Sequence, residues 1–147
     1  MLRIAIVDDN IYFAEAVEKQ TEAFFVLKGE VVEIWKGCGK DLLGILEKRQ
    51  NFEIYFLDVK MPEMNGLVLA EKVRAFDPGG RIILLTAYDR YALQGIRLGV
   101  YYYILKDHYE PELFRISDAW SMGRIFAVLY PAVSGNPDKH GAGGSEN

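Results

Sequence analysis

Acidic, hydroxyl and ammonium side chains stand where short apolar runs of the sequence end. Asp8 and Asp9 follow the first run, Asp58 the third, Thr86 the fourth and Lys106 the fifth. Carboxylates held close together need a cation, and an oxygen-only ligand set suits Mg²⁺. A carboxylate can also attack phosphorus and form an aspartyl phosphate. These residue types therefore indicate phosphoryl chemistry beside a metal, with a hydroxyl and an ammonium group available to bind phosphoryl oxygens.

Each of these residues also has a simpler interpretation when it is taken alone. An aspartate after a strand is usually a helix cap or a turn residue. A lysine at a strand end is usually a solvated charge, and threonine is common in strands for its β propensity. The combined pattern favours the chemical interpretation, because all of these positions fall at strand ends.

Predicted strands and helices alternate along the chain, and these elements must position the residues named above. Five β-branched or aromatic runs predict strands, at Ile4–Val7, Val31–Trp35, Ile54–Leu57, Ile82–Leu85 and Val100–Leu105. Several runs are apolar almost throughout, as expected for strands covered on both faces of a parallel sheet. The segments between them have helical spacing. The alternation predicts an α/β fold, a doubly wound parallel sheet whose sites form beyond the carboxyl ends of its strands.

Capping residues mark where the helices should begin. The expected N-caps are Asn10, Asp41, Asn65 and Asp89, and Pro111 suits the first turn of a fifth helix. Glycines at positions 29, 79, 80 and 99 fall where helices should stop.

We expect a single domain at residues 1–125. Residues 126–147 form an atypical tail, and we expect disorder from about residue 135 because large apolar side chains are missing there.

Composition narrows the class of protein. Of the 147 residues, 50% are hydrophobic and 26% charged, which provides for a sizeable core. Lysine and arginine total 17 against 21 aspartates and glutamates, a formal net charge of −4 that argues against direct nucleic-acid binding. A single cysteine, Cys38, excludes an internal disulfide and a multi-thiolate metal site. No run approaches the roughly 18 apolar residues of a membrane span. We therefore expect a cytoplasmic protein.

Four blocks of the sequence resemble the receiver domain of two-component response regulators. The blocks are Ile4–Asn10, Phe56–Gly66, Leu84–Ala87 and Tyr103–Lys106. The second contains the specific pattern Asp-x-x-Met-Pro-x-Met-x-Gly. The resemblance covers roughly residues 1–120 and implies a flavodoxin-like (βα)5 fold with strand order 2-1-3-4-5. Residues 86–92 resemble receivers of the subgroup whose output is a LytTR DNA-binding domain.

The resemblance also implies roles for individual residues. Asp58 matches the phosphoacceptor, which takes a phosphoryl group from a histidine kinase. Asp8 and Asp9 match the acidic pair that holds Mg²⁺, and Asp58 with the backbone carbonyl of Lys60 completes the protein ligands.

Further positions match the parts that respond to the phosphoryl group. Thr86 and Lys106 match the pair that contacts it, and Tyr103 matches the aromatic switch position. Pro62 and Gly66 match the structural turn after the acceptor. Receivers usually carry a proline after the lysine, whereas Asp107 follows Lys106 here.

The resemblance places the output surface on the fourth helix, fifth strand and fifth helix. That surface would include residues 88–98, Tyr101–Tyr103 and the start of the helix after Glu110, and we expect a phosphorylation-dependent homodimer through it. The function that follows is a signalling switch, which catalyses only its own phosphoryl transfer and hydrolysis.

Two alternatives remain from other classes. One is an aspartyl-phosphate phosphohydrolase, although such enzymes commonly place an acid where Lys60 stands. The other is a receiver-like interaction module that is not phosphorylated. A flavin or nucleotide protein is less favoured, because Asp8-Asp9-Asn10 would repel a phosphate after the first strand.

Overall fold

A parallel five-stranded sheet forms the centre of the protein. The computed structural model describes residues 1–87 and 89–106. The strands are β1 (Leu2–Val7), β2 (Val32–Lys36), β3 (Ile54–Leu57), β4 (Arg81–Thr86) and β5 (Tyr102–Leu105). Their order is β2-β1-β3-β4-β5, and every pair is parallel. The α/β class and the strand order 2-1-3-4-5 are confirmed.

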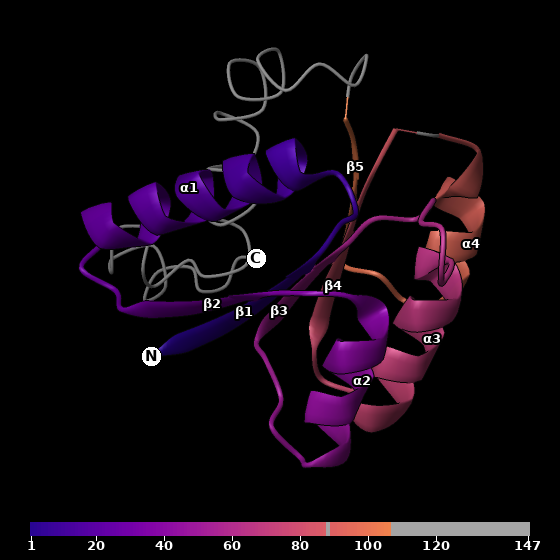
Figure 1. Cartoon of the computed structure of the whole chain (residues 1–147), viewed down its shortest axis with the longest axis horizontal. Helices are drawn as coiled ribbons and strands as arrows, with labels where there is room; N and C mark the ends of the chain where they lie inside the picture. Colours follow the sequence, from indigo (N-terminus) through magenta and orange to yellow (C-terminus); the bar gives the residue numbers. More distant parts are fainter. Residues whose placement is uncertain (88, 107–147) are drawn as a thin grey trace, which may run out of the picture.

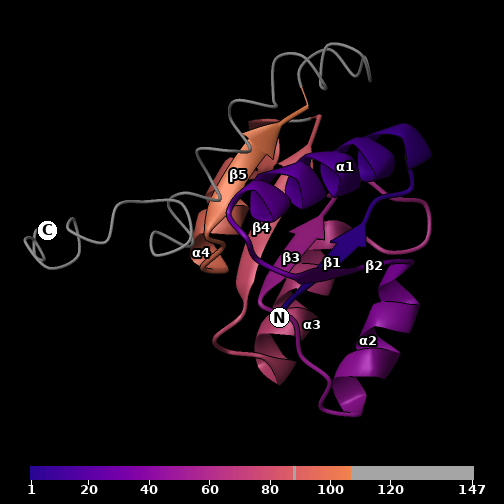
Figure 2. The same cartoon turned by 90° about the vertical axis from the view of Figure 1, so that its left-hand side faces the viewer.

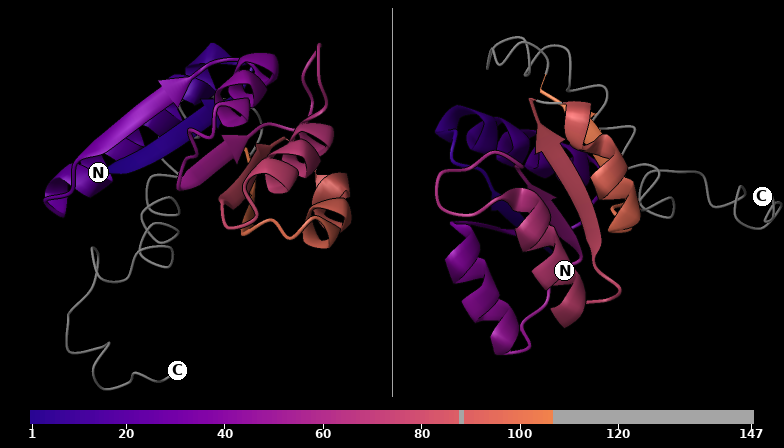
Figure 3. Two further views of the ribbon diagram at one scale, coloured as in Figure 1. Left: turned by 90° about the horizontal axis from the view of Figure 1, so that it is seen from below. Right: turned by 90° about the vertical axis from the view of Figure 1, so that its right-hand side faces the viewer.

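Helices cover both faces of this sheet. They are α1 (Ile11–Leu27), α2 (Gly39–Glu47), α3 (Gly66–Phe76) and α4 (Ala92–Arg97), and a 3₁₀ turn, η1 (Asp89–Tyr91), precedes α4. Helix α1 lies on one face, and α2, α3 and α4 lie on the other (Figure 1; Figure 2). On that second face the three helices follow one another in sequence order (Figure 3). The chain therefore winds in two directions from β1, and a crevice forms where the directions part.

Alternating strand residues divide the core into two layers. Ile4, Ile6 and Phe56 pack toward α1, and Ala5, Val7 and Leu57 pack toward α2 and α3. The central strands β1, β3 and β4 are buried almost throughout, as their continuous apolar sequence predicts. A shift of one residue in register would exchange the two layers, so the packing of each layer against its own helices favours the observed register.

Two of the four expected N-caps are confirmed. The Asn10 side chain accepts hydrogen bonds from the first turn of α1, and the Asn65 side chain accepts one from Leu67 N. The prediction for Asp41 was wrong: α2 begins earlier, after Cys38, and Asp41 lies in its first turn. The prediction for Asp89 was also wrong, since the cap residue of α4 is Tyr91. The carboxylate at Asp41 still favours its helix by facing the positive end of the helix dipole.

Some expectations concern residues outside the described ones. These are the fifth helix after Pro111, the domain end near residue 125 and the tail from 126 to 147. Among the described helices, none combines the length and apolar character that a membrane crossing needs.

Candidate functional site

Three aspartates meet at the carboxyl ends of β1 and β3. The two strands are paired up to Val7 and Leu57, so the residues that follow them lie side by side. The Asp58 N–H donates to the Val7 carbonyl oxygen at 2.9 Å, which extends this pairing by one residue, to Asp58. Asp8, Asp9 and Asp58 each offer one carboxylate oxygen, and these three atoms lie within 4.8 Å of one another. The structure thus brings together the three carboxylates that the sequence predicted.

Lys106 reaches this cluster from β5. Its backbone N–H donates to the Thr86 carbonyl oxygen at 2.7 Å, which continues the β4–β5 ladder past the end of β5. The Lys106 Nζ atom lies 2.5 Å from Asp8 Oδ2 and 3.7 Å from Asp58 Oδ2. The side chain is only 4% exposed. The lysine is therefore a buried cation whose closer partner is Asp8.

Burial dominates the electrostatics of Asp58. Burial and, next, the neighbouring Asp8 carboxylate together raise the pKa of Asp58 from 3.8 to about 7, although Lys106 opposes the change. Burial also raises the pKa of Asp8, again against the attraction of Lys106. One lysine does not neutralise the cluster, so its ionised form favours an additional cation.

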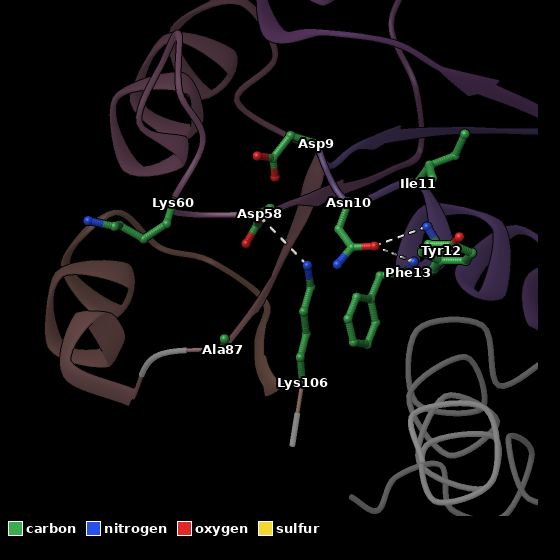
Figure 4. A pocket seen from close by; sticks show the side chains of 9 residues that line it. All are labelled: Asp9, Asn10, Ile11, Tyr12, Phe13, Asp58, Lys60, Ala87 and Lys106. Atoms are coloured by element: carbon green, nitrogen blue, oxygen red, sulfur yellow. Dashed lines mark hydrogen bonds and ion pairs between the residues drawn. The ribbon is translucent and has the colours of Figure 1, made fainter. Parts of the chain in front are cut away.

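The chemistry of the donor set fits Mg²⁺. Three hard carboxylate oxygens converge on one point, and Asp9 is exposed, which leaves room for the waters that Mg²⁺ retains. A cavity of about 500 Å³ opens at this point and is lined by Asp9, Asp58, Lys60 and Lys106, among others (Figure 4). The Lys60 side chain points away from Asp58 (Figure 4). Its backbone carbonyl as a further ligand remains a prediction.

Thr86 and Tyr103 project from the same face of the sheet. The ladder pairs Leu84 with Tyr103 and Thr86 with Leu105, so Thr86 and Tyr103 are diagonal neighbours. The Thr86 hydroxyl is fully buried and has no hydrogen-bond partner in the part of the chain that the structure describes. Tyr103 is half-buried against the layer that contains Leu84. A buried hydroxyl of this kind is available to a group that enters the site.

The turn after Asp58 depends on glycine at position 66. The Gly66 N–H donates to the Val59 carbonyl oxygen at 2.8 Å. A Cβ atom at this position would lie 1.8 Å from the Asp58 carbonyl oxygen, which no side chain could tolerate. The resemblance implied a structural turn at Pro62 and Gly66, and the structure adds the reason for the glycine: the start of α3 touches the backbone of Asp58.

Sequence analysis missed two contributors to the site. The Asn10 backbone N–H donates to Asp8 Oδ1 at 2.8 Å, and the Phe13 ring lies 4.5 Å from Lys106 Nζ. In the sequence, Phe13 is simply an apolar residue of α1. Its spacing predicts that its ring is buried in the core, but does not indicate that the ring contacts a cation.

The chain is similar to several known proteins. A family model described as the response regulator receiver domain matches residues 4–117. The chain is 30% identical over 138 residues to the uncharacterized transcriptional regulatory protein YxjL of Bacillus subtilis, covering 89% of this chain and 60% of that protein. It is 31% identical over 108 residues to the sensory transduction protein LytT of Bacillus anthracis, covering 72% of this chain and 42% of that protein.

A solved structure shows the same fold. The response regulator receiver domain protein (CheY-like) from Methanospirillum hungatei JF-1 superimposes with a TM-score of 0.57 at 26% identity, covering 86% of this chain and 98% of that one. The two curated relatives are longer, and the chain spans only 60% and 42% of their lengths.

Proposed function

The chain belongs to the response regulator receiver domain family of two-component systems, and from this premise we propose that Asp58 is its phosphoacceptor. A histidine kinase supplies the phosphoryl group, in the cytoplasm, and Mg²⁺ is required. The observation that supports this role is the position of Asp58: a buried carboxylate, 6% exposed, beside two further carboxylates and a lysine.

The reaction is an in-line displacement at phosphorus. An Asp58 carboxylate oxygen attacks, the bond from phosphorus to the kinase histidine nitrogen breaks, and an aspartyl phosphate forms. Mg²⁺, held by Asp8, Asp9 and Asp58, would supply neutralising charge for the phosphoryl oxygens. Asp58 must be ionised to attack, and a nearby cation lowers a pKa that burial has raised to about 7.

Lys106 and Thr86 provide the remaining contacts to the phosphoryl group. The Lys106 ammonium group lies 3.7 Å from Asp58 Oδ2, close enough to bind an oxygen added there. The Thr86 hydroxyl would gain a partner from the same group. A shift of Thr86 changes the space beside Tyr103, its diagonal neighbour, so one local charge event can bias a surface between two states.

The phosphohydrolase alternative is less favoured by the site. Hydrolases of that kind commonly place a general acid two residues after the nucleophile, and that position holds Lys60, whose side chain points away from Asp58 (Figure 4). We therefore propose a signalling phosphoacceptor that turns over only its own phosphoryl group.

Acetyl phosphate provides a direct test. The protein should gain one phosphoryl group by intact-mass measurement when Mg²⁺ is present and none in EDTA. Asp58→Asn should gain none, and Asp9→Ala should require far more Mg²⁺. An equal gain in Asp58→Asn would show that another residue accepts the phosphoryl group, and would refute the assignment.

We further propose that phosphorylation promotes a homodimer through α4 and β5. Several large apolar side chains are exposed on these two elements: Leu93, Ile96, Tyr102 and Leu105. Such side chains are typical of protein interfaces when they gather on one surface. The helix expected after Glu110 lies outside the described residues.

Sedimentation with Mg²⁺ and beryllofluoride should show a rise in mass that Ile96→Glu abolishes. An unchanged mass at high micromolar concentration would contradict the dimer.

A further inference from the structure

The ring of Phe13 lies against the ammonium end of Lys106. The Lys106 Nζ atom is 4.5 Å from the ring centroid, and the ring stands beside the lysine side chain (Figure 4). Phe13 is 0% exposed and Lys106 3%. A cation over an aromatic face is attracted by the ring quadrupole, and the attraction grows when both groups are withdrawn from water.

The position of this ring is determined by the start of α1. Phe13 lies in the first turn, where its N–H faces the Asn10 side chain, and its ring packs into the core layer that includes Ile6 and Phe56. Asn10 also donates its own N–H to Asp8. One short segment therefore places both the carboxylate and the ring that contact the same ammonium group.

Lys106 has two carboxylates within reach but contacts them unequally. Its Nζ atom lies 2.5 Å from Asp8 Oδ2 and 3.7 Å from Asp58 Oδ2. A ring on the α1 side favours the ammonium position next to Asp8, since Asp8 precedes the same helix. An Asp8 oxygen that is paired with this cation attracts a second cation less strongly, because the ammonium group already neutralises part of its charge.

We propose that Phe13 is a positioning residue, whose ring holds the Lys106 ammonium group against Asp8, so that Lys106 competes with a metal ion for this carboxylate. This inference rests on the proposed Mg²⁺ site. It assigns Lys106 a second role before phosphorylation, as the internal counter-cation of Asp8. Weakening the contact with the ring should strengthen Mg²⁺ binding.

The expected effect is a lower dissociation constant for Mg²⁺. Phe13→Leu keeps an apolar side chain in the core but removes the aromatic face. A cation–π contact between buried groups corresponds to a change of about fivefold or more in an equilibrium constant. Replacing Phe13 site-specifically with 3,4,5-trifluorophenylalanine keeps the shape of the ring and weakens its quadrupole, so it separates electrostatics from packing.

The measurement is an NMR titration of the full chain with MgCl₂ alone. The amides of Asn10 and Val59 report on the site, because they donate to Asp8 and Asp58. Phe25→Leu is the matched control, since Phe25 is equally buried in the same core layer of α1. Both Phe13 replacements should bind Mg²⁺ about fivefold more tightly than the parent chain, and Phe25→Leu should match it. The ring-current shift of the Lys106 ε-methylene protons should disappear in Phe13→Leu.

A double-mutant cycle completes the test. In a Lys106→Met background the Phe13 replacements should leave Mg²⁺ affinity unchanged, because the cation that the ring holds is gone. Equal affinities of the parent chain and both Phe13 replacements would overturn the inference while leaving the metal site in place. An effect that persists in the Lys106→Met background would also overturn it, by showing a packing role. Failure of the parent chain to bind Mg²⁺ would overturn the proposed function and the inference together.

Discussion

Replacing Asp58 with asparagine should stabilise the fold at neutral pH. The Asp58 carboxylate is buried beside Asp8, and burial, with the repulsion of that neighbour, raises its pKa from 3.8 to about 7. The folded state therefore holds a proton that the unfolded chain has already lost. Above pH 7 both states are ionised, and folding must bury a charge without its full hydration. Asparagine removes this cost and keeps the size of the side chain.

The magnitude follows from the difference between the two pKa values. The pKa of Asp58 is near 7 in the folded state and 3.8 in the unfolded chain, a difference of about 3. This difference corresponds to a loss of roughly 4 kcal/mol in the free energy of unfolding when the carboxyl is ionised in both states. The sign follows from proton linkage: between these two values the folded state binds more protons, so stability falls as pH rises from about 4 to 7. Asp58→Asn should gain about 2–4 kcal/mol over the parent chain at pH 8, and almost nothing at pH 4.

Urea denaturation in EDTA, at intervals from pH 4 to pH 8, measures this difference. Glu71→Gln serves as the control, because Glu71 is an exposed carboxylate on α3 and its replacement should change stability by less than about 0.5 kcal/mol. Added Mg²⁺ should narrow the gap by stabilising only the parent chain. A gain of equal size at pH 4 and pH 8 would refute the reasoning, because it would come from packing or hydrogen bonding rather than from the buried charge.

Two further predictions concern the stability of the fold. Gly66→Ala should lower the free energy of unfolding by on the order of 3 kcal/mol or more, because the added Cβ would meet the Asp58 carbonyl oxygen at 1.8 Å; Gly44→Ala, in open space on α2, should raise it by about 0.5–1 kcal/mol in the same urea assay. Tyr55→Phe should cost about 1–3 kcal/mol, since it removes the 2.7 Å hydrogen bond from the Tyr55 hydroxyl to the buried Asp77 carboxylate. A Tyr55→Phe chain with an unchanged urea midpoint would contradict that role.

The order of strands and helices, and most residues of the candidate site, could be predicted from the sequence alone. Continuous apolar runs predicted the central strands, and the residue after each run marked the rim where Asp8, Asp58, Thr86 and Lys106 meet. These signals are local. A few adjacent residues are enough to indicate that a strand is buried on both faces and to show where it ends. Short-range capping was less reliable. Asn10 was predicted correctly as a cap, but aspartates inside a first turn resemble caps in sequence.

Only the tertiary structure determined which charged groups of the site contact one another. Lys106 contacts Asp8 more closely than Asp58, and Phe13 faces its ammonium group. The pKa of Asp58 depends on burial by elements from several parts of the chain. Gly66 is required by a contact with the Asp58 backbone, not by a left-handed turn. Such features depend on distances of a few ångströms between residues far apart in sequence. Residue type and spacing do not determine those distances, because they arise from the packing of whole elements.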